Sequence, residues 1–230
     1  MRAALVIPAL NEEASIGAVL DEVPQAWFCA VIVADNGSTD RTAEEAAARG
    51  ARIAVEPRRG YGSACLKALE ALPAEAEVVV FMDGDGSDDP READRLLRPI
   101  REDRADLVVG SRVLGRPERG ALHPHQRLGN WIATRLLRLL LGHGYTDLGP
   151  FRAIRADSLR RLKMKDRGYG WTVEMQIQAL RHGLRVEEVP VSRRPRMSGE
   201  SKVSGSLRGS FAAGCKILWT VARGAMASRR

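Results

Sequence analysis

Cysteine and aromatic residues are both scarce in this chain. Its 230 residues include three cysteines, Cys29, Cys65 and Cys215, and no two of them form a Cys-x-x-Cys pair. We therefore expect neither a disulfide framework nor a zinc site, and scattered thiols fit a reducing compartment. Aromatic residues make up only 5% of the chain. The sequence therefore does not suggest the stacking platforms that bind single-stranded nucleic acid, and nucleic acid is not an expected partner.

Long apolar runs are also missing. The sequence holds no stretch of about 18 consecutive apolar residues, the length that a membrane-spanning helix needs. The first apolar stretch is broken at Pro8, too early for a signal peptide. We expect a cytoplasmic protein, or one bound peripherally to the cytoplasmic face of a membrane.

Acidic residues are almost absent from the C-terminal end. The formal net charge is +7, and residues 191–230 hold nine arginines and lysines but a single acid, Glu200. Such an end can face an anionic membrane or a phosphorylated substrate, although a solvated charged surface is the commoner outcome. Hydrophobic content of 44% and charged content of 28% are typical of a globular protein, and the length suits one α/β domain.

Strands and helices alternate through the first 110 residues. Short apolar runs predict buried strands, and apolar positions at helical spacing predict the helices between them. This alternation indicates βαβ units on a mostly parallel central sheet, hence an α/β fold. The expected strands are residues 2–7, 30–34, 52–55, 78–82 and 107–110, and the expected helices are residues 11–23, 41–49, 60–72 and 92–102.

The pattern changes after residue 110. A helix rich in leucine and arginine is expected over residues 126–141, and we interpret it as buried core, with a lipid-binding groove as the alternative. A strand is expected within residues 146–154 and a helix over residues 172–182. Residues 186–191 predict an edge strand, where Pro190 is tolerated. A last amphipathic helix, residues 207–226, either packs on the domain or lies at a membrane interface.

Two aspartates follow the most apolar of these strands. The apolar run 78–82 ends at Asp83-Gly84-Asp85. Open α/β sheets bind ligands at the carboxyl ends of their strands, and Asp83 and Asp85 point to the same side of an extended chain. Two hard oxygen donors suit Mg²⁺ or Mn²⁺ bridged to substrate phosphates. The alternative is a polar turn in which Asp88 or Asp89 caps the next helix.

Two other expected strands also end in ligand-type residues. Asn11 and Glu12 follow the first, and residues 35–40, Asp-Asn-Gly-Ser-Thr-Asp, follow the second. Together with Asp83-x-Asp85 and residues 59–64, these motifs resemble the inverting glycosyltransferases of family two, which have the GT-A fold. The resemblance covers most of the chain. It implies a single Rossmann-like GT-A domain, residues 1–205. Residues 206–230 would be a C-terminal helix and basic tail, within that domain or as a membrane-interface anchor.

The resemblance also implies roles for these residues. Asp83 and Asp85 would hold Mg²⁺ or Mn²⁺ and the diphosphate of a UDP- or GDP-hexose, and Asp35 would contact the base. A divalent cation stabilises the charge that develops on a leaving diphosphate. The implied nucleotide-sugar site comprises Pro8, Ala9, Asn11, Glu12, Asp35, Gly37, Ser38, Gly60, Tyr61, Asp83, Gly84 and Asp85.

Motifs in the second half resemble the polyprenyl-phosphate glycosyltransferases within that family. They are residues 110–112, 147–152, 170–174 and 196–202. This group implies transfer of a hexose, with inversion, to a lipid phosphate. Such an acceptor is already ionised, so positioning and electrostatics would do most of the catalysis. Asp147 is implied to orient the acceptor or act as base, with Glu174 as its rival, and the phosphate-binding candidates are Arg112, Arg127, Arg196 and Lys202.

Two positions depart from that group's pattern. Ser87 stands where those relatives commonly have Gln, and serine is the weaker metal ligand. Pro150 falls in a segment that usually reads Ser-Gly-Phe-Arg and here reads Gly-Pro-Phe-Arg. The details of the metal and acceptor sites are therefore expected to differ.

Other functions stay open at this point. Transfer to a soluble hydroxyl, such as a sugar or a glycerate-like acid, would require a true general base. A catalytically silent nucleotide-sugar-binding subunit is disfavoured by the intact Asp83-x-Asp85 pair. Nucleotidyl transfer is disfavoured because no glycine-rich, lysine-bearing loop lies near Pro8. Expected partners are an anionic membrane surface and a membrane-anchored subunit or a second copy of the chain.

Overall fold

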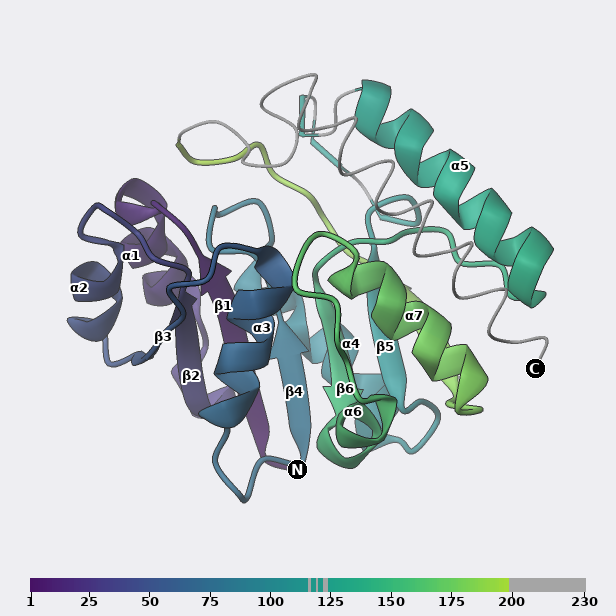
Figure 1. Ribbon diagram of the computed structural model, residues 1–230, viewed down its shortest axis with the longest axis horizontal. Helices are drawn as coiled ribbons and strands as arrows, with labels where there is room; N and C mark the ends of the chain where they lie inside the picture. The colour runs from purple at the N-terminus through teal and green to yellow at the C-terminus, as the bar shows by residue number, and fades with distance from the viewer. Residues whose placement is uncertain (116, 119, 122–123, 199–230) are drawn as a thin grey trace.

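A seven-stranded sheet forms the centre of the molecule (Figure 1). The computed structural model describes residues 1–115, 117–118, 120–121 and 124–198, apart from the side chains of residues 125, 126 and 141. The strand order is β3-β2-β1-β4-β6-β5-β7. β6 is antiparallel to both of its neighbours, and the other neighbouring pairs are parallel. The expected mostly parallel sheet is confirmed.

The strands lie close to where the apolar runs predict them. β7 pairs with β5 and closes one end of the sheet, which confirms the predicted edge strand. The bounds are β1 (Ala3–Ala9), β2 (Phe28–Asp35), β3 (Arg52–Val55), β4 (Val78–Phe81), β5 (Leu107–Ser111), β6 (Arg152–Arg155) and β7 (Val186–Pro190).

Helices cover both faces of the sheet, because successive strand residues point to opposite sides. Leu5 of β1 belongs to one buried cluster and Val6 to the other. The Leu5 cluster includes residues of α1 (Glu13–Glu22), α2 (Thr42–Ala47) and α4 (Ala93–Arg101). The Val6 cluster includes residues of α3 (Tyr61–Glu70), α5 (Pro124–Leu141), α6 (Ala156–Leu162) and α7 (Trp171–Arg181). Two short 3-10 helices, η1 (Gln25–Trp27) and η2 (Pro90–Glu92), precede β2 and α4.

Two elements of the second half differ from the sequence prediction. The strand expected within residues 146–154 is present only as Arg152–Arg155. Residues 146–148 are not a strand, because side chains such as Glu188 and Asn130, rather than a neighbouring strand, bind their backbone groups. Helix α6 was not predicted. It starts directly after β6 and buries Leu159 and Leu162.

The interpretation of residues 126–141 as buried core is wrong for most of α5. Ala133 and Leu137 are buried, whereas Leu128, Trp131 and Leu139 are 58%, 57% and 79% exposed. Helix α5 lies at the outside of the fold (Figure 1). It packs through a narrow face and leaves several apolar side chains exposed.

In the described part of the chain, no helix has both the length and the apolar character needed to cross a bilayer. The predicted helix 207–226 and the proposed division at residue 206 lie outside the described residues.

The loop after α6 docks against the start of α3. Gly62 N donates to Gly168 O over 3.2 Å, and Ser63 N donates to Arg167 O over 3.0 Å. A Cβ at Gly62 would overlap the carbonyl oxygen of Asp166. Glycine is therefore required at Gly62 because another backbone passes there.

We predict that Gly62→Ala lowers the free energy of unfolding by about 1–3 kcal/mol, because the new methyl group forces the 166–168 backbone away. Gly129→Ala is the matched control. A Cβ at Gly129 meets no atom within 4 Å, and alanine is favoured over glycine within a helix by about 1 kcal/mol. Urea unfolding should show opposite shifts for the two variants, and equal midpoints would contradict the close contact.

Candidate active site

Parallel strands β2, β1 and β4 are neighbours, so their carboxyl ends meet at one edge of the sheet. This edge brings together the predicted segments that follow Ala9, Asp35 and Phe81. Direct bonds join the first two segments: Asn36 N donates to Ala9 O over 2.9 Å, and Asn11 N donates to Ser38 Oγ over 3.0 Å. Ligand sites of open α/β sheets lie at such an edge.

Asp35 is buried at the end of β2, and its Oδ1 accepts from Ser38 N over 3.2 Å. The neighbouring Asn36, which was not among the candidates, makes more bonds. Its Nδ2 donates to Glu56 O and Arg58 O, at 3.1 and 2.8 Å, and its Oδ1 accepts from Gly60 N at 2.7 Å. Asn36 therefore holds the 56–60 loop in place beside Asp35.

Gly60 and Tyr61 lie at the start of α3, against which the backbone of residues 166–168 packs. Gly60 has φ 140°, and a Cβ there would overlap the carbonyl oxygen of Arg167. Burial raises the pKa of Tyr61 well above its usual value, and its hydroxyl has no partner among the described residues. The first amide groups of α3 are taken by backbone carbonyls, so the structure gives these residues a packing role.

Three aspartates crowd the end of β4. The side chain of Asp83 is one-quarter exposed, that of Asp85 is mostly buried, and that of Asp88 is buried. Asp88 Oδ2 accepts a hydrogen bond from Asp83 N at 3.2 Å. Arg193 lies between them, with Nη1 2.7 Å from Asp88 Oδ1 and Nη2 3.8 Å from Asp83 Oδ2. Asp89 caps η2 by accepting from Arg91 N, as the alternative interpretation of this turn expected.

A segment from the C-terminal half, residues 193–197, crosses this aspartate turn. Arg194 N donates to Ser87 O over 2.9 Å, and Met197 N donates to Asp85 O over 3.0 Å. Arg196 contributes two ion pairs, one with Glu12 and one with Asp85 Oδ2 at 3.4 Å. The predicted residues Glu12, Asp85 and Arg196 therefore lie together.

Ser87 forms hydrogen bonds with Asp85 in the same turn. Its N–H donates to Asp85 Oδ1 over 3.0 Å, and its hydroxyl donates to the same oxygen. Burial acts to raise the pKa of Asp85, but Arg193, the Ser87 bond and Arg196 outweigh it and hold the pKa below its usual value. Burial and the charges of Asp85 and Asp88 raise the pKa of Asp83 to about 7. The arginines therefore stabilise the charged form of Asp85, whereas burial favours the uncharged form of Asp83.

Asp147 and Arg112 form a buried, bidentate ion pair. Asp147 Oδ2 accepts from Arg112 N and Nε at 2.8 and 2.7 Å, and its Oδ1 accepts from Nη2 at 2.6 Å. Burial acts against the charged form of Asp147, but Arg112 prevails and lowers its pKa. A carboxylate held in this way orients the arginine and is a poor proton acceptor.

The remaining predicted residues lie apart from this pair. Both oxygens of Glu174 accept from Lys165 N, at 3.2 and 3.1 Å, and one also accepts from Asp166 N at 2.7 Å. Arg127 is exposed in the first turns of α5, and Lys202 lies outside the described residues. Arg193 was not a candidate, and the only sequence signal for it was the basic run 193–196.

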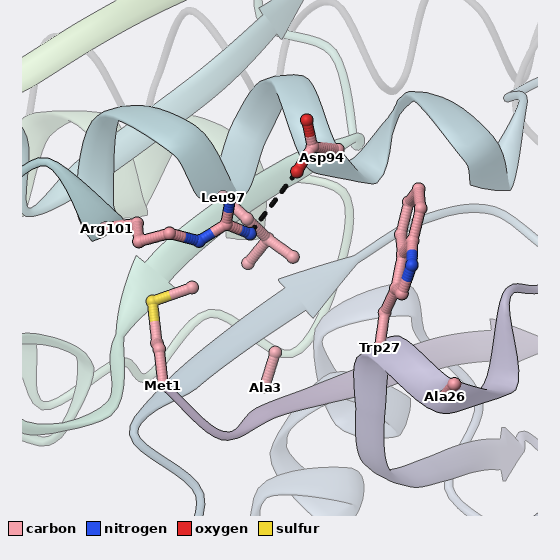
Figure 2. A pocket seen from close by; sticks show the side chains of 7 residues that line it. All are labelled: Met1, Ala3, Ala26, Trp27, Asp94, Leu97 and Arg101. Carbon is pink, nitrogen blue, oxygen red and sulfur yellow. Dashed lines mark hydrogen bonds and ion pairs between the residues drawn. The ribbon is translucent and has the colours of Figure 1, made fainter.

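A cavity of about 260 Å³ lies at the opposite edge of the sheet. Met1, Ala3, Trp27 and residues of α4 line it, and the Asp94–Arg101 ion pair of 3.3 Å crosses it (Figure 2). It lies at the amino end of β1, whereas the carboxylates and arginines described above follow the carboxyl ends. We therefore place the candidate active site at the carboxyl edge.

Comparison with known proteins shows which family the chain belongs to. The family model described as glycosyl transferase family 2 matches residues 4–163. This chain belongs to that family. The match spans β1 to α6 and so includes the turns that carry Asp35, Asp83 and Asp147.

Two relatives of this family 2 glycosyltransferase are similar over most of its length. An uncharacterized glycosyltransferase of Mycobacterium tuberculosis is 41% identical over 91% of this chain and 93% of the relative. The undecaprenyl-phosphate mannosyltransferase of Micrococcus luteus is 34% identical over 91% of this chain and 90% of the relative. The crystal structure of glucosyl-3-phosphoglycerate synthase from M. tuberculosis, in complex with Mn²⁺, UDP-glucose and phosphoglyceric acid, is similar with a TM-score of 0.78. It is 25% identical, over 97% of this chain and 79% of that one.

We predict that Asp147→Asn lowers the free energy of unfolding by about 3–5 kcal/mol at neutral pH, because Arg112 loses its charged partner in a buried setting. The lowered pKa of Asp147 means that its stabilising effect is complete above about pH 4 and is lost as the pH falls below that value. The stability difference between the variant and the native protein should therefore shrink in acid.

Urea unfolding between about pH 7 and pH 3 measures this difference. Asp157→Asn is the control, since Asp157 forms an exposed pair with Arg160 within one helix, and such pairs contribute little. A stability loss for Asp147→Asn that did not change with pH would refute the charge-based role.

Proposed function

We propose that this glycosyltransferase moves a hexose from a nucleoside diphosphate sugar to a polyprenyl phosphate, with inversion at the anomeric carbon. A phosphate oxygen of the acceptor forms the new bond to the anomeric carbon while the bond to the nucleoside diphosphate breaks. The acceptor phosphate is already ionised, so no side chain has to remove a proton.

We choose a phosphate acceptor because both carboxylates that could act as a base already have hydrogen-bond partners. Asp147 is occupied by Arg112, and Glu174 is occupied by the amides of residues 165 and 166. A hydroxyl acceptor would need one of these carboxylates as a base, whereas a phosphate acceptor needs positive charge and alignment. Arg112, Arg193 and Arg196 lie around the site with charge of that kind.

A divalent cation such as Mn²⁺ or Mg²⁺ fits the aspartate turn. The described residues hold no group of three or more His, Cys, Asp or Glu side chains arranged for a metal. Mg²⁺, however, is commonly bound by one or two carboxylates together with substrate phosphates. Burial and the neighbouring carboxylates raise the pKa of Asp83, and a bound cation would favour its charged form. Asp83 and Asp85 would hold the ion, which would stabilise the charge on the departing diphosphate.

The outward face of α5 supports a lipid acceptor. Leu128, Trp131 and Ile132 are exposed on it, and Arg135 stacks 5.7 Å above the Trp131 ring. A helix with apolar and basic residues on its exposed surface is suited to the interface of an anionic membrane. The M. luteus relative, named for undecaprenyl phosphate, and a polyprenol monophosphomannose synthase of Mycolicibacterium smegmatis, 32% identical, support the same acceptor.

A second candidate is transfer to a small phosphorylated hydroxy acid. The likeness to glucosyl-3-phosphoglycerate synthase favours it. It would require a base that neither Asp147 nor Glu174 provides in the present arrangement, and it would leave the apolar face of α5 without a use.

A transfer assay separates these candidates. Labelled UDP- and GDP-hexoses are offered with Mn²⁺ or Mg²⁺ to a short polyprenyl phosphate and, in parallel, to 3-phosphoglycerate and simple sugars. We expect label only in the lipid phosphate. Label only in a soluble acceptor would overturn the proposed acceptor, and saturable donor binding without any transfer would favour a silent subunit.

Asp85→Ala should lower turnover by at least about 100-fold and weaken Mn²⁺ binding while leaving the fold intact, because one of the two cation ligands is lost. Electron paramagnetic resonance of free Mn²⁺ reports binding independently of activity. Asp94→Ala, on α4 at the opposite edge of the sheet, is the matched control. Unchanged Mn²⁺ binding and turnover in Asp85→Ala would refute the metal site.

A further inference from the structure

Residues 146–148 form a turn that does not pair with a strand, yet all of its backbone N–H and C=O groups have hydrogen-bond partners. Glu188 Oε1 on β7 accepts from Thr146 N and Asp147 N at 3.0 and 3.1 Å. Gln176 Nε2 on α7 donates to Asp147 O at 2.9 Å, and Arg152 on β6 donates to Leu148 O at 3.4 Å. Side chains from separate elements therefore fix a turn that would otherwise be held weakly.

Asn130, on α5, binds the turn on both sides of Asp147. Its Nδ2 donates to Thr146 O at 3.0 Å, and its Oδ1 accepts from Leu148 N at 3.0 Å. One amide group thus sets the backbone before and after Asp147, and with it the direction of the carboxylate. Asn130 lies next to Gly129 and Trp131, on the helix whose outer face is apolar.

The Asp147 carboxylate in turn orients Arg112. It binds Nε and Nη2 of the guanidinium, at 2.7 and 2.6 Å. Gly149 leaves the space for this pair, since a Cβ there would lie 3.3 Å from Arg112 Nε. Nη1 of Arg112 has no partner among the residues that the structure describes. Arg112 directly follows β5, which runs in the same direction as β4 because both are antiparallel to β6, so Arg112 lies at the same edge of the sheet as the aspartate turn.

We propose that Asn130 is a positioning residue for the transfer reaction. Through the 146–148 turn and Asp147, it aims the remaining donor group of Arg112 at a substrate phosphate. The inference rests on the proposed function, because it gives Arg112 a phosphate to bind. The phosphate belongs either to the lipid acceptor or to the donor diphosphate, and separate KM values for the two substrates distinguish these sources.

The test compares Asn130→Ala and Asn130→Asp with Thr134→Ala in the full-length protein. Thr134 is a buried polar residue one turn further along α5, and its hydroxyl donates only within the helix, to Trp131 O at 3.1 Å. Small misplacement of a binding group lowers rates by up to about 100-fold. We expect kcat/KM to fall about 10- to 100-fold in both Asn130 variants, with a raised KM for one phosphate substrate, and to stay within about twofold in Thr134→Ala.

A double-mutant cycle with Arg112→Gln shows whether Asn130 acts through Arg112. If it does, Asn130→Ala adds less than about twofold to the loss caused by Arg112→Gln, because coupled residues are not additive. Full additivity, or native kcat/KM in Asn130→Ala beside an impaired Arg112→Gln, would overturn the inference and leave the proposed function standing. Native kcat/KM in Arg112→Gln would instead refute the phosphate-binding role of Arg112 and the inference that rests on it.

A substrate-free readout keeps the proposal testable if a variant folds poorly. The ¹⁵N-labelled arginine Nε–H signal of Arg112, assigned from Arg112→Gln, reports its bond to Asp147. We expect this signal to shift in Asn130→Asp, whose carboxylate cannot donate to Thr146 O, and to stay unchanged in Thr134→Ala. An identical signal in Asn130→Asp would show that Asn130 does not position Arg112.

Discussion

Pairing of buried carboxylates with arginines is the interaction on which this site depends. Asp83, Asp85, Asp88 and Asp147 all lie wholly or mostly out of water, where an unpaired charge is strongly unfavourable. Arg112 pairs with both carboxylate oxygens of Asp147. Arg193 pairs with Asp88 and Asp83, and Arg196 pairs with Asp85. Burial and the neighbouring carboxylates still raise the pKa of Asp83.

The arginines of this site come from two distant parts of the chain, Arg112 after β5 and Arg193 and Arg196 after β7. Residues 193–197 return over the aspartate turn after the edge strand β7, and backbone bonds to Asp85 and Ser87 fix their path. Arg112 directly follows β5 and pairs with Asp147, whose turn is bound from α5, α7, β6 and β7. Positive charge is therefore gathered at this edge of the sheet from segments far apart in the sequence.

Ser87 and two glycines at the start of α3 make their contacts within the protein. Ser87 bonds to Asp85 and so shapes the aspartate turn instead of reaching outward. Gly60 and Gly62 admit the 166–168 backbone, so the amides at the start of α3 already have partners. In both places the observed contacts hold neighbouring segments of the chain together.

The sequence by itself determined the parallel half of the fold and its functional edge, because apolar runs, helical spacing and strand-end aspartates are local signals. It predicted β1 to β5 and placed Asp35, Asp83 and Asp85 at strand ends, where the sheet brings them together. Only the tertiary structure decided the pairings: Asp147 with Arg112, 35 positions apart, and Arg196 with Glu12, 184 apart. It also decided that α5 lies on the surface. The physical reason is that burial and partner choice depend on neighbours distant in the chain, and an isolated pattern of leucine or arginine does not reveal which neighbour it will meet.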